Sequence, residues 1–190
     1  MIYQNVADIF AANDAIRSRL SARAAELNEA QQNFRPTADA WSPAEIVEHL
    51  ALIEGRLTKL FSMMLHKLES AAAAEGGTTP RPMEPFSLDE FAAQAQQKFN
   101  APEEVRPSGG VKLADALAQL QASRAALNAL RPRVEAVDGA AAAYQHPAFG
   151  ALNLYQWLAF IGAHEQRHLR QLERLLAQMD SATDGTGAAA

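Results

Sequence analysis

The sequence lacks cysteine altogether, and this excludes disulfide bonds, catalytic thiolates and metal sites built on thiolate ligands. Aromatic residues make up only 7% of the chain, and β-branched residues are sparse beside abundant alanine, which favours helix over strand. No run of about 18 apolar residues occurs, so we expect no transmembrane helix and no membrane partner. The first residues lack the basic start and apolar segment of a secretory signal, and a cytoplasmic protein is therefore the expectation.

The charge balance is mildly acidic, with a formal net charge of -5 and no dense run of lysine and arginine. This balance argues against a protein that binds nucleic acid through its phosphates. A length of 190 residues fits one domain. We expect that domain to span residues 1–179 and the small, polar segment 180–190 to be a disordered tail.

Four segments carry apolar residues at spacings of three and four, the pattern of amphipathic helices. The predicted helices cover residues 6–32, 43–70, 113–130 and 154–179. Together they predict an all-α protein, a four-helix bundle in which each helix buries one apolar stripe.

Two of these helices have clear start signals. Ser42 followed by Glu45 forms a capping box before the second helix. Asn153 followed by Gln156 does the same before the fourth. Trp41, before the first of these caps, and Trp157 are interpreted as packing residues.

The connection over residues 71–111 is rich in Ala, Gly, Thr and Pro. A short extra helix is predicted within it, over residues 87–99. So long a connection would let the second and third helices run parallel, and it could cover a pocket.

Three of the five histidines occupy positions where the helical pattern asks for Leu or Ile. His164 and His168 are four residues apart, so their imidazoles lie one turn apart on one helix face. His49 lies on the inward face of another helix. Three neutral imidazoles from facing helices can bind one divalent metal ion and leave a position open for water or substrate. The alternative is three core histidines satisfied by ordinary hydrogen bonds.

Residues His164 to His168 also match the H-E-x-x-H pattern of zinc proteases, in which Glu165 would be the general base. No strand run is evident and little chain follows the motif, so a true protease is disfavoured. Glu165 remains a candidate catalytic residue that would orient a metal-bound water. A salt bridge on the side of the helix is the competing interpretation.

Arg124 and Glu45 have two interpretations each. Arg124 falls on an apolar stripe, where it would either form a buried salt bridge or anchor a substrate or thiol. Glu45 could orient His49, but its capping role already accounts for it. His66 and His146 are interpreted as surface or loop-packing residues.

Two stretches resemble the DinB/YfiT-like superfamily. WSPAEIVEHL at residues 41–50 is similar to the signature of its second helix, and HPAFG at 146–150, Trp157 and HEQRHL at 164–169 resemble its last helix. Residues 99–107 also look like a DinB-type segment. The resemblance covers about residues 6–179, and its paired signature sets the order and spacing of the three histidines.

The resemblance implies a four-helix bundle that binds nickel, zinc or a similar ion on His49, His164 and His168. It also implies frequent dimerisation, so a homodimer is an expectation. Related proteins of known activity are transferases or isomerases that use a low-molecular-weight thiol, and others are named as metal-dependent hydrolases.

Two alternative functions therefore remain open. The first is a metal-dependent enzyme, a thiol S-transferase or a hydrolase, that acts on a small molecule with or without a thiol as co-substrate. The second is a non-catalytic bundle stabilised by its metal, with a structural or protein-interaction role. A coordination position that faces a solvent-reachable cavity favours the enzyme, and a site closed by a fourth ligand such as Glu45 favours the structural role.

Overall fold

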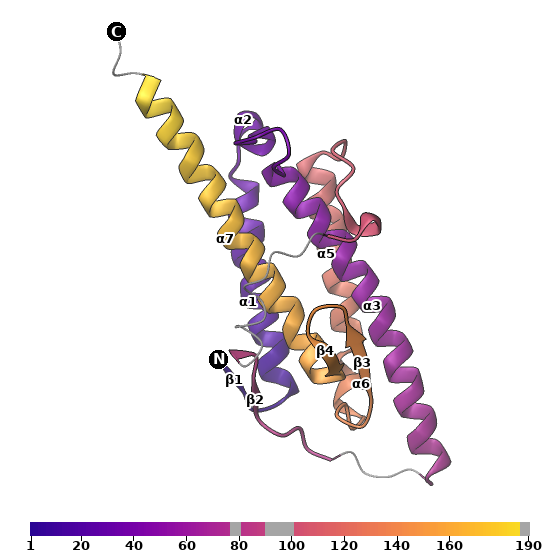
Figure 1. Ribbon diagram of the computed structural model, residues 1–190. Coiled ribbons are helices and arrows are strands. Elements are labelled where there is room, and N and C mark those ends of the chain that lie inside the picture. Colours follow the sequence, from indigo (N-terminus) through magenta and orange to yellow (C-terminus); the bar gives the residue numbers. More distant parts are fainter. Residues whose placement is uncertain (77–80, 90–100, 187–190) are drawn as a thin grey trace.

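The computed structural model describes residues 1–76, 81–89 and 101–186, with side chains described as far as Ser181. Four long helices dominate it (Figure 1). These are α1 (Val6–Ala25), α3 (Pro43–Ala74), α5 (Leu113–Ala129) and α7 (Leu154–Thr186). Shorter elements connect them: α2 (Glu29–Asn33), the 3-10 helix η2 (Glu103–Val105) and α6 (Arg131–Glu135). The predicted four-helix bundle is confirmed.

The helix predicted over residues 6–32 is in fact two helices. α1 ends at Ala25, and α2 begins after Asn28. The side chain of Asn28 accepts from the backbone N–H of Gln31, and the side chain of Gln31 accepts from the backbone N–H of Asn28. This capping box starts a new helix and turns the chain before α3.

Both predicted capping boxes are present. The backbone N–H of Ser42 donates to Glu45 Oε2 over 2.8 Å at the start of α3. Asn153 and Gln156 exchange two such bonds of 2.9 Å at the start of α7. The far ends of both helices differ from expectation, because α3 continues to Ala74 and α7 to Thr186.

The long helices form two parallel pairs. Glu54 of α3 contacts Arg124 of α5, and Glu69 of α3 contacts Arg133 of α6, which follows α5 directly. Residue numbers therefore rise together along α3 and along α5 with α6. In α1 and α7, Asn13 contacts Leu158, and Arg17 contacts Glu165. Residue numbers again rise together, so this pair is parallel too. The two pairs run in opposite directions (Figure 1). The long connection between α3 and α5 makes this topology feasible, as expected from its length.

The bundle core has two apolar halves. One half gathers side chains such as Phe10, Phe61 and Leu158, and the other gathers Leu20, Ile46 and Leu172 among others. Between the halves lie four buried charged residues, one from each long helix: Arg17, Glu54, Arg124 and Glu165. We call these four residues the ionic layer.

Two small antiparallel ladders were not expected from the sequence. β1 (Ile2–Tyr3) pairs with β2 (Phe86–Ser87), and β3 (Ala143–His146) pairs with β4 (Gly150–Asn153). No strand run was evident in the sequence, so these short strands are an addition to the predicted helical fold. Two- and four-residue strands are too short for an alternating pattern to stand out in a helical sequence.

The remaining expectations concern the connection and the tail. The short helix predicted over residues 87–99 lies mostly outside the described residues, although Ser87 belongs to β2. Residues 187–190 of the predicted tail also lie outside them. Across the described residues, no helix is both long and apolar enough to cross a membrane.

Candidate metal centre

The three histidines singled out from the sequence come together between α3 and α7. One ring nitrogen from each of His49, His164 and His168 lies within 4.8 Å of the others. The Nε2 atoms of His164 and His168 are 3.2 Å apart. His49 and His168 are buried, and His164 is half-buried.

Hydrogen bonds fix the ring orientation of two of these histidines. Nδ1 of His49 donates to the backbone carbonyl of Val105 over 2.7 Å. Nδ1 of His168 donates to the side-chain oxygen of Gln171 over 2.9 Å. Because Nδ1 carries the proton in both rings, each Nε2 is left with a free lone pair, the state that a metal ligand requires.

Burial keeps all three rings neutral at physiological pH. It lowers the pKa of His168 to about 3, and the repulsion that a protonated His49 would exert adds to the effect. Burial also lowers the pKa of His49, and it lowers the pKa of His164 well below its usual value. Neutral imidazole is the form that binds a metal ion, so no proton needs to be displaced near pH 7.

The donor set fits a small divalent ion. Metal–nitrogen bonds of about 2.1 Å in a tetrahedral site set a nitrogen–nitrogen distance of about 3.4 Å. The 3.2 Å between the two Nε2 atoms of α7 is close to this value. Three imidazoles without a thiolate suit zinc, nickel and related ions alike.

Aromatic rings line the site. Trp41 lies 4.7 Å from the ring of His49 and stacks on that of His168 at 6.4 Å, measured between centroids. Phe160 stacks on His164 at 5.9 Å. Trp41 also packs against the apolar core half that contains Ile46, as its interpretation as a packing residue requires, and its indole shields the histidines.

A large cavity opens beside the three histidines. Its volume is about 1660 Å³, and all three imidazoles line it. The connection between α3 and α5 supplies part of its wall, including Val105, whose carbonyl holds His49. A ligand in this cavity could therefore reach the nitrogen cluster directly.

Comparison with known proteins assigns the family. The model of the DinB superfamily matches residues 12–172. The chain belongs to the DinB superfamily. It is 27% identical over 157 residues to the uncharacterized protein YuaE of Bacillus subtilis (strain 168), an alignment that covers 82% of this chain and 90% of YuaE.

Two solved structures share the fold of this DinB protein. TT2238, a four-helix bundle protein, aligns with a TM-score of 0.57 and 24% identity over 88% of this chain and 97% of TT2238. YfiT from Bacillus subtilis aligns with a TM-score of 0.60 and 15% identity over 90% of this chain and 86% of YfiT. YfiT is described as a probable metal-dependent hydrolase with an unusual four-helix bundle topology.

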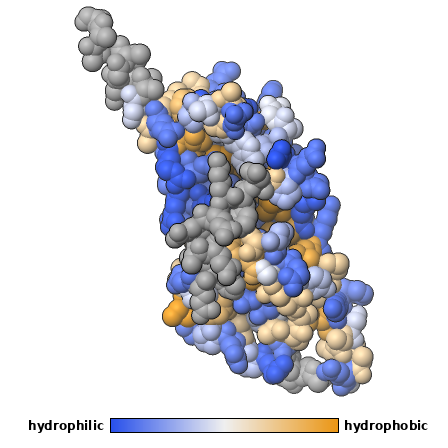
Figure 2. Space-filling model, in the orientation of Figure 1, coloured by the Kyte–Doolittle hydropathy of each residue, from blue (hydrophilic) through white to orange (hydrophobic). Residues whose placement is uncertain are grey.

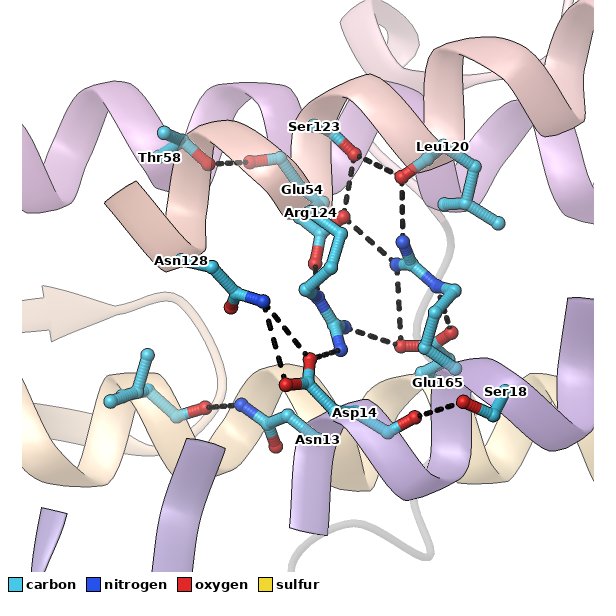
Figure 3. Close-up of polar contacts among 12 residues, drawn as sticks. Asn13, Asp14, Ser18, Glu54, Thr58, Leu120, Ser123, Arg124, Asn128 and Glu165 are labelled. Atoms are coloured by element: carbon cyan, nitrogen blue, oxygen red, sulfur yellow. Dashed lines mark hydrogen bonds and ion pairs between the residues drawn. The ribbon is translucent and has the colours of Figure 1, made fainter. Parts of the chain in front are cut away.

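Glu165 points away from the histidines and into the ionic layer. Its Oε1 accepts from Nε of Arg17, and its Oε2 accepts from Arg124 over 2.9 Å (Figure 3). The side chain is 1% exposed. Burial raises the pKa of this carboxyl, and the charges of Arg17 and Arg124 partly offset that effect. The salt bridge, one of the two sequence interpretations, is what the structure shows, and this geometry gives the catalytic interpretation no support.

Arg124 belongs to the same layer and does not line the cavity. It donates to Glu54 over 2.8 Å, to Glu165 over 2.9 Å and to Asp14 over 3.1 Å. These contacts engage all three nitrogens of the guanidinium group, and the side chain is buried away from the cavity, so nothing in this geometry supports the proposed role as a substrate or thiol anchor. Of the two interpretations, the buried salt bridge is the one present.

Glu45 is also occupied elsewhere. Its carboxylate caps α3 through Ser42 and forms an ion pair of 2.7 Å with Arg35. No bond joins it to His49, whose ring is held by Val105 instead. Nothing among the described contacts makes Glu45 a fourth ligand that would close the site.

Sequence reasoning missed several residues of the site. The carbonyl of Val105 carries no side-chain signal, whereas Gln171 could have been found as a polar residue one turn after His168. His146 packs against Phe149, as its loop-packing interpretation requires, but it also lines the cavity. Its Nδ1 accepts from the backbone N–H of Ala148 over 3.0 Å, which places the proton of the neutral ring on Nε2.

Proposed function

We propose that this DinB protein is a metal-dependent enzyme that binds one divalent ion on His49, His164 and His168 and acts on a small molecule. Hydrolysis is the leading reaction, and transfer of an external thiol is the second. The observation that carries the proposal is that three neutral imidazoles converge on the wall of a cavity of about 1660 Å³. The description of YfiT as a probable metal-dependent hydrolase supports the same class.

Each residue of the site would have a separate role in this function. His49, His164 and His168 would hold the ion, while Val105 and Gln171 keep two of the rings oriented. A bound divalent ion would supply Lewis acidity, lowering the pKa of a water or thiol and polarising a substrate oxygen. Trp41 and Phe160 would exclude bulk water from the histidine side of the cavity.

An open cavity favours an enzyme over a structural metal site. A structural ion is surrounded by protein ligands on every side, whereas a catalytic ion keeps one position open. Glu45, the candidate that would close the site, is bound to Ser42 and Arg35. The non-catalytic alternative would require a fourth protein ligand, and the described contacts supply no candidate.

Metal content is the direct test. The protein is purified, supplemented separately with zinc and nickel, desalted and subjected to elemental analysis, and about one equivalent of bound metal is expected. His49→Ala should weaken metal affinity at least about tenfold, because it removes one of three ligands. His66→Ala is the matched control, since His66 is an exposed histidine on the same helix. Less than about a tenth of an equivalent bound, or equal affinity in both variants, contradicts the proposal.

Activity is tested separately on metal-loaded protein. A panel of small esters, amides and electrophiles is assayed with and without a low-molecular-weight thiol and with and without chelator. Turnover that needs metal but no thiol supports hydrolysis, and turnover that needs both supports thiol transfer. A full equivalent of metal with no turnover in either arm favours the non-catalytic alternative. Dimerisation, expected from the resemblance, remains a prediction that sedimentation of the same samples will test.

A further inference from the structure

The cavity wall is rich in arginine although the chain is acidic overall. Five arginines and no lysine line the cavity, against three carboxylates, in a protein of formal net charge -5. The arginines are Arg19, Arg56, Arg106, Arg167 and Arg170. The carboxylates are Asp39, Asp89 and Glu104, and Asp89 is already paired with the N-terminal ammonium group of Met1. Local charge in the cavity is therefore opposite in sign to that of the whole chain.

Arg167 is the arginine of this group closest in sequence to the metal centre. It lies between two of the proposed ligands, His164 and His168, and its side chain is exposed. Its charge lowers the pKa of His49, His164 and His168 alike, so its field reaches the whole histidine cluster. Hydrophilic side chains follow the outer side of this part of α7 (Figure 2).

No carboxylate among the described residues forms an ion pair with Arg167. Of the other cavity arginines, Arg19 donates to the side chain of Gln166 and Arg106 donates to the carbonyl of Ala101. Arg56 and Arg170 are exposed like Arg167, but only Arg167 lies between two of the proposed ligands. By contrast, Arg17 bonds two carboxylates in the ionic layer, and Arg124 bonds those two and Asp14 as well. An exposed guanidinium without a partner, on the wall of a cavity, is available to a ligand.

A cation and a guanidinium on one wall repel each other, and an anion between them is attracted by both. Arginine presents a planar fork of donors that matches the oxygens of a carboxylate or phosphate. We propose that Arg167 anchors an anionic group, a carboxylate or a phosphate, on the small molecule that enters the cavity. This inference rests on the proposed function, because it assigns a substrate class to the same cavity.

Binding of simple probes tests the inference. Trp41 and Trp157 both line the cavity and are the only tryptophans of the chain, so their fluorescence reports a bound ligand. Succinate and inorganic phosphate are titrated at constant ionic strength into metal-free protein, and succinate also into zinc-loaded protein. Succinamide, which has nearly the same shape without the charge, is the neutral control. We expect succinate or phosphate to bind at least about tenfold more tightly than succinamide. The stronger of the two probes identifies the preferred anion.

The variants locate the binding site. Arg167→Gln should weaken binding of the preferred anion about tenfold or more, and Arg167→Lys should recover part of the loss by restoring the charge. Arg174→Gln is the matched control, because Arg174 is an exposed arginine on the same helix that does not line the cavity. Its affinity should stay within about twofold of the unaltered protein. Equal binding of succinate and succinamide, or equal losses in Arg167→Gln and Arg174→Gln, overturns the inference.

Failure of this inference is distinguishable from failure of the proposed function. Metal content is measured on the same samples by elemental analysis. A full equivalent of metal without selective anion binding refutes the anchor and leaves the metal centre standing. Selective anion binding that depends on Arg167 but without any bound metal supports the anchor and refutes the metal-dependent function.

Discussion

The role of Glu165 can be decided by replacing it with glutamine. Both of its carboxylate oxygens accept from guanidinium groups, and the side chain is 1% exposed. In Glu165→Gln, the buried cations Arg17 and Arg124 would have only Glu54 as a buried counter-charge, with the half-buried Asp14 at the edge. We therefore expect loss of stability, with the histidine cluster left in place.

The size of the effect follows from burial of the pair. Removing one partner of a buried ion pair costs about 3–5 kcal/mol, because the other charge stays buried without compensation. Glutamine keeps the shape and one acceptor oxygen, so the lower end, about 3 kcal/mol, is expected. For a chain of this size, that corresponds to a fall in Tm of about 6–12 °C.

The assay compares urea and thermal unfolding of Glu165→Gln with those of Glu173→Gln. Glu173 is exposed on the same helix, so its variant should stay within about 0.5 kcal/mol of the parent. The double variant Arg17→Met with Glu165→Gln should lose less than the sum of the two single losses, since one arginine then faces one glutamate.

The metal affinity of the Glu165→Gln variant tests whether Glu165 also contributes to the histidine site. Glu165 makes no described contact with the histidines, so the metal affinity of Glu165→Gln should stay within about threefold of the parent. A variant with unchanged stability and metal affinity that had nonetheless lost its activity would refute this reasoning. It would instead support Glu165 as the general base of the H-E-x-x-H pattern.

The remaining predictions concern stability. In chelated protein, lowering the pH from 7 to 5 should cost about 2 kcal/mol through His168 alone, because the unfolded chain takes up a proton near pH 6.5 that the folded state resists until about pH 3. Urea unfolding of His168→Gln should show a smaller loss over this range, and equal losses would contradict the argument. Gly162→Ala should destabilise the fold by about 1–3 kcal/mol, because a methyl group there would collide with the side-chain oxygen of Asn13 on α1. Gly55→Ala, with nothing within 4 Å of the added carbon, should instead stabilise α3 by about 0.5–1 kcal/mol in the same thermal melts.

Much of the helical architecture was predictable, because its signals are local. Apolar spacing and capping residues act within a turn or two, so the starts of α3 and α7 were found correctly from Ser42 and Asn153. The apolar pattern alone was misleading near Asn28. It predicted one continuous helix over residues 6–32, but a capping box at Asn28 divides this segment into α1 and α2. The short strands β3 and β4 were missed, since a hairpin of this size is decided by packing on α7.

The histidines were predictable because they stand where an apolar residue is expected. Inward placement follows from helix period alone, and it requires each ring to find a partner or an ion. The hydrogen-bond partners of the histidines could not be predicted. Val105, for example, accepts from His49 through its backbone carbonyl, a group that every residue has. Arg167 was not predicted as a site residue, because its exposure and its lack of an ion pair among the described residues are properties of the folded chain.

For this protein, the sequence by itself determined the four amphipathic helices, their starts and the inward-facing histidines, since these depend on neighbours a few residues away. Only the tertiary structure decided which charges meet and which remain open to a ligand. Arg17 and Glu165 are 148 residues apart in the chain, and the parallel pairing of α1 with α7 brings them together. A buried charge takes whichever opposite charge the packing places beside it, and for Glu165 and Arg124 that partner is in the ionic layer rather than at the metal centre.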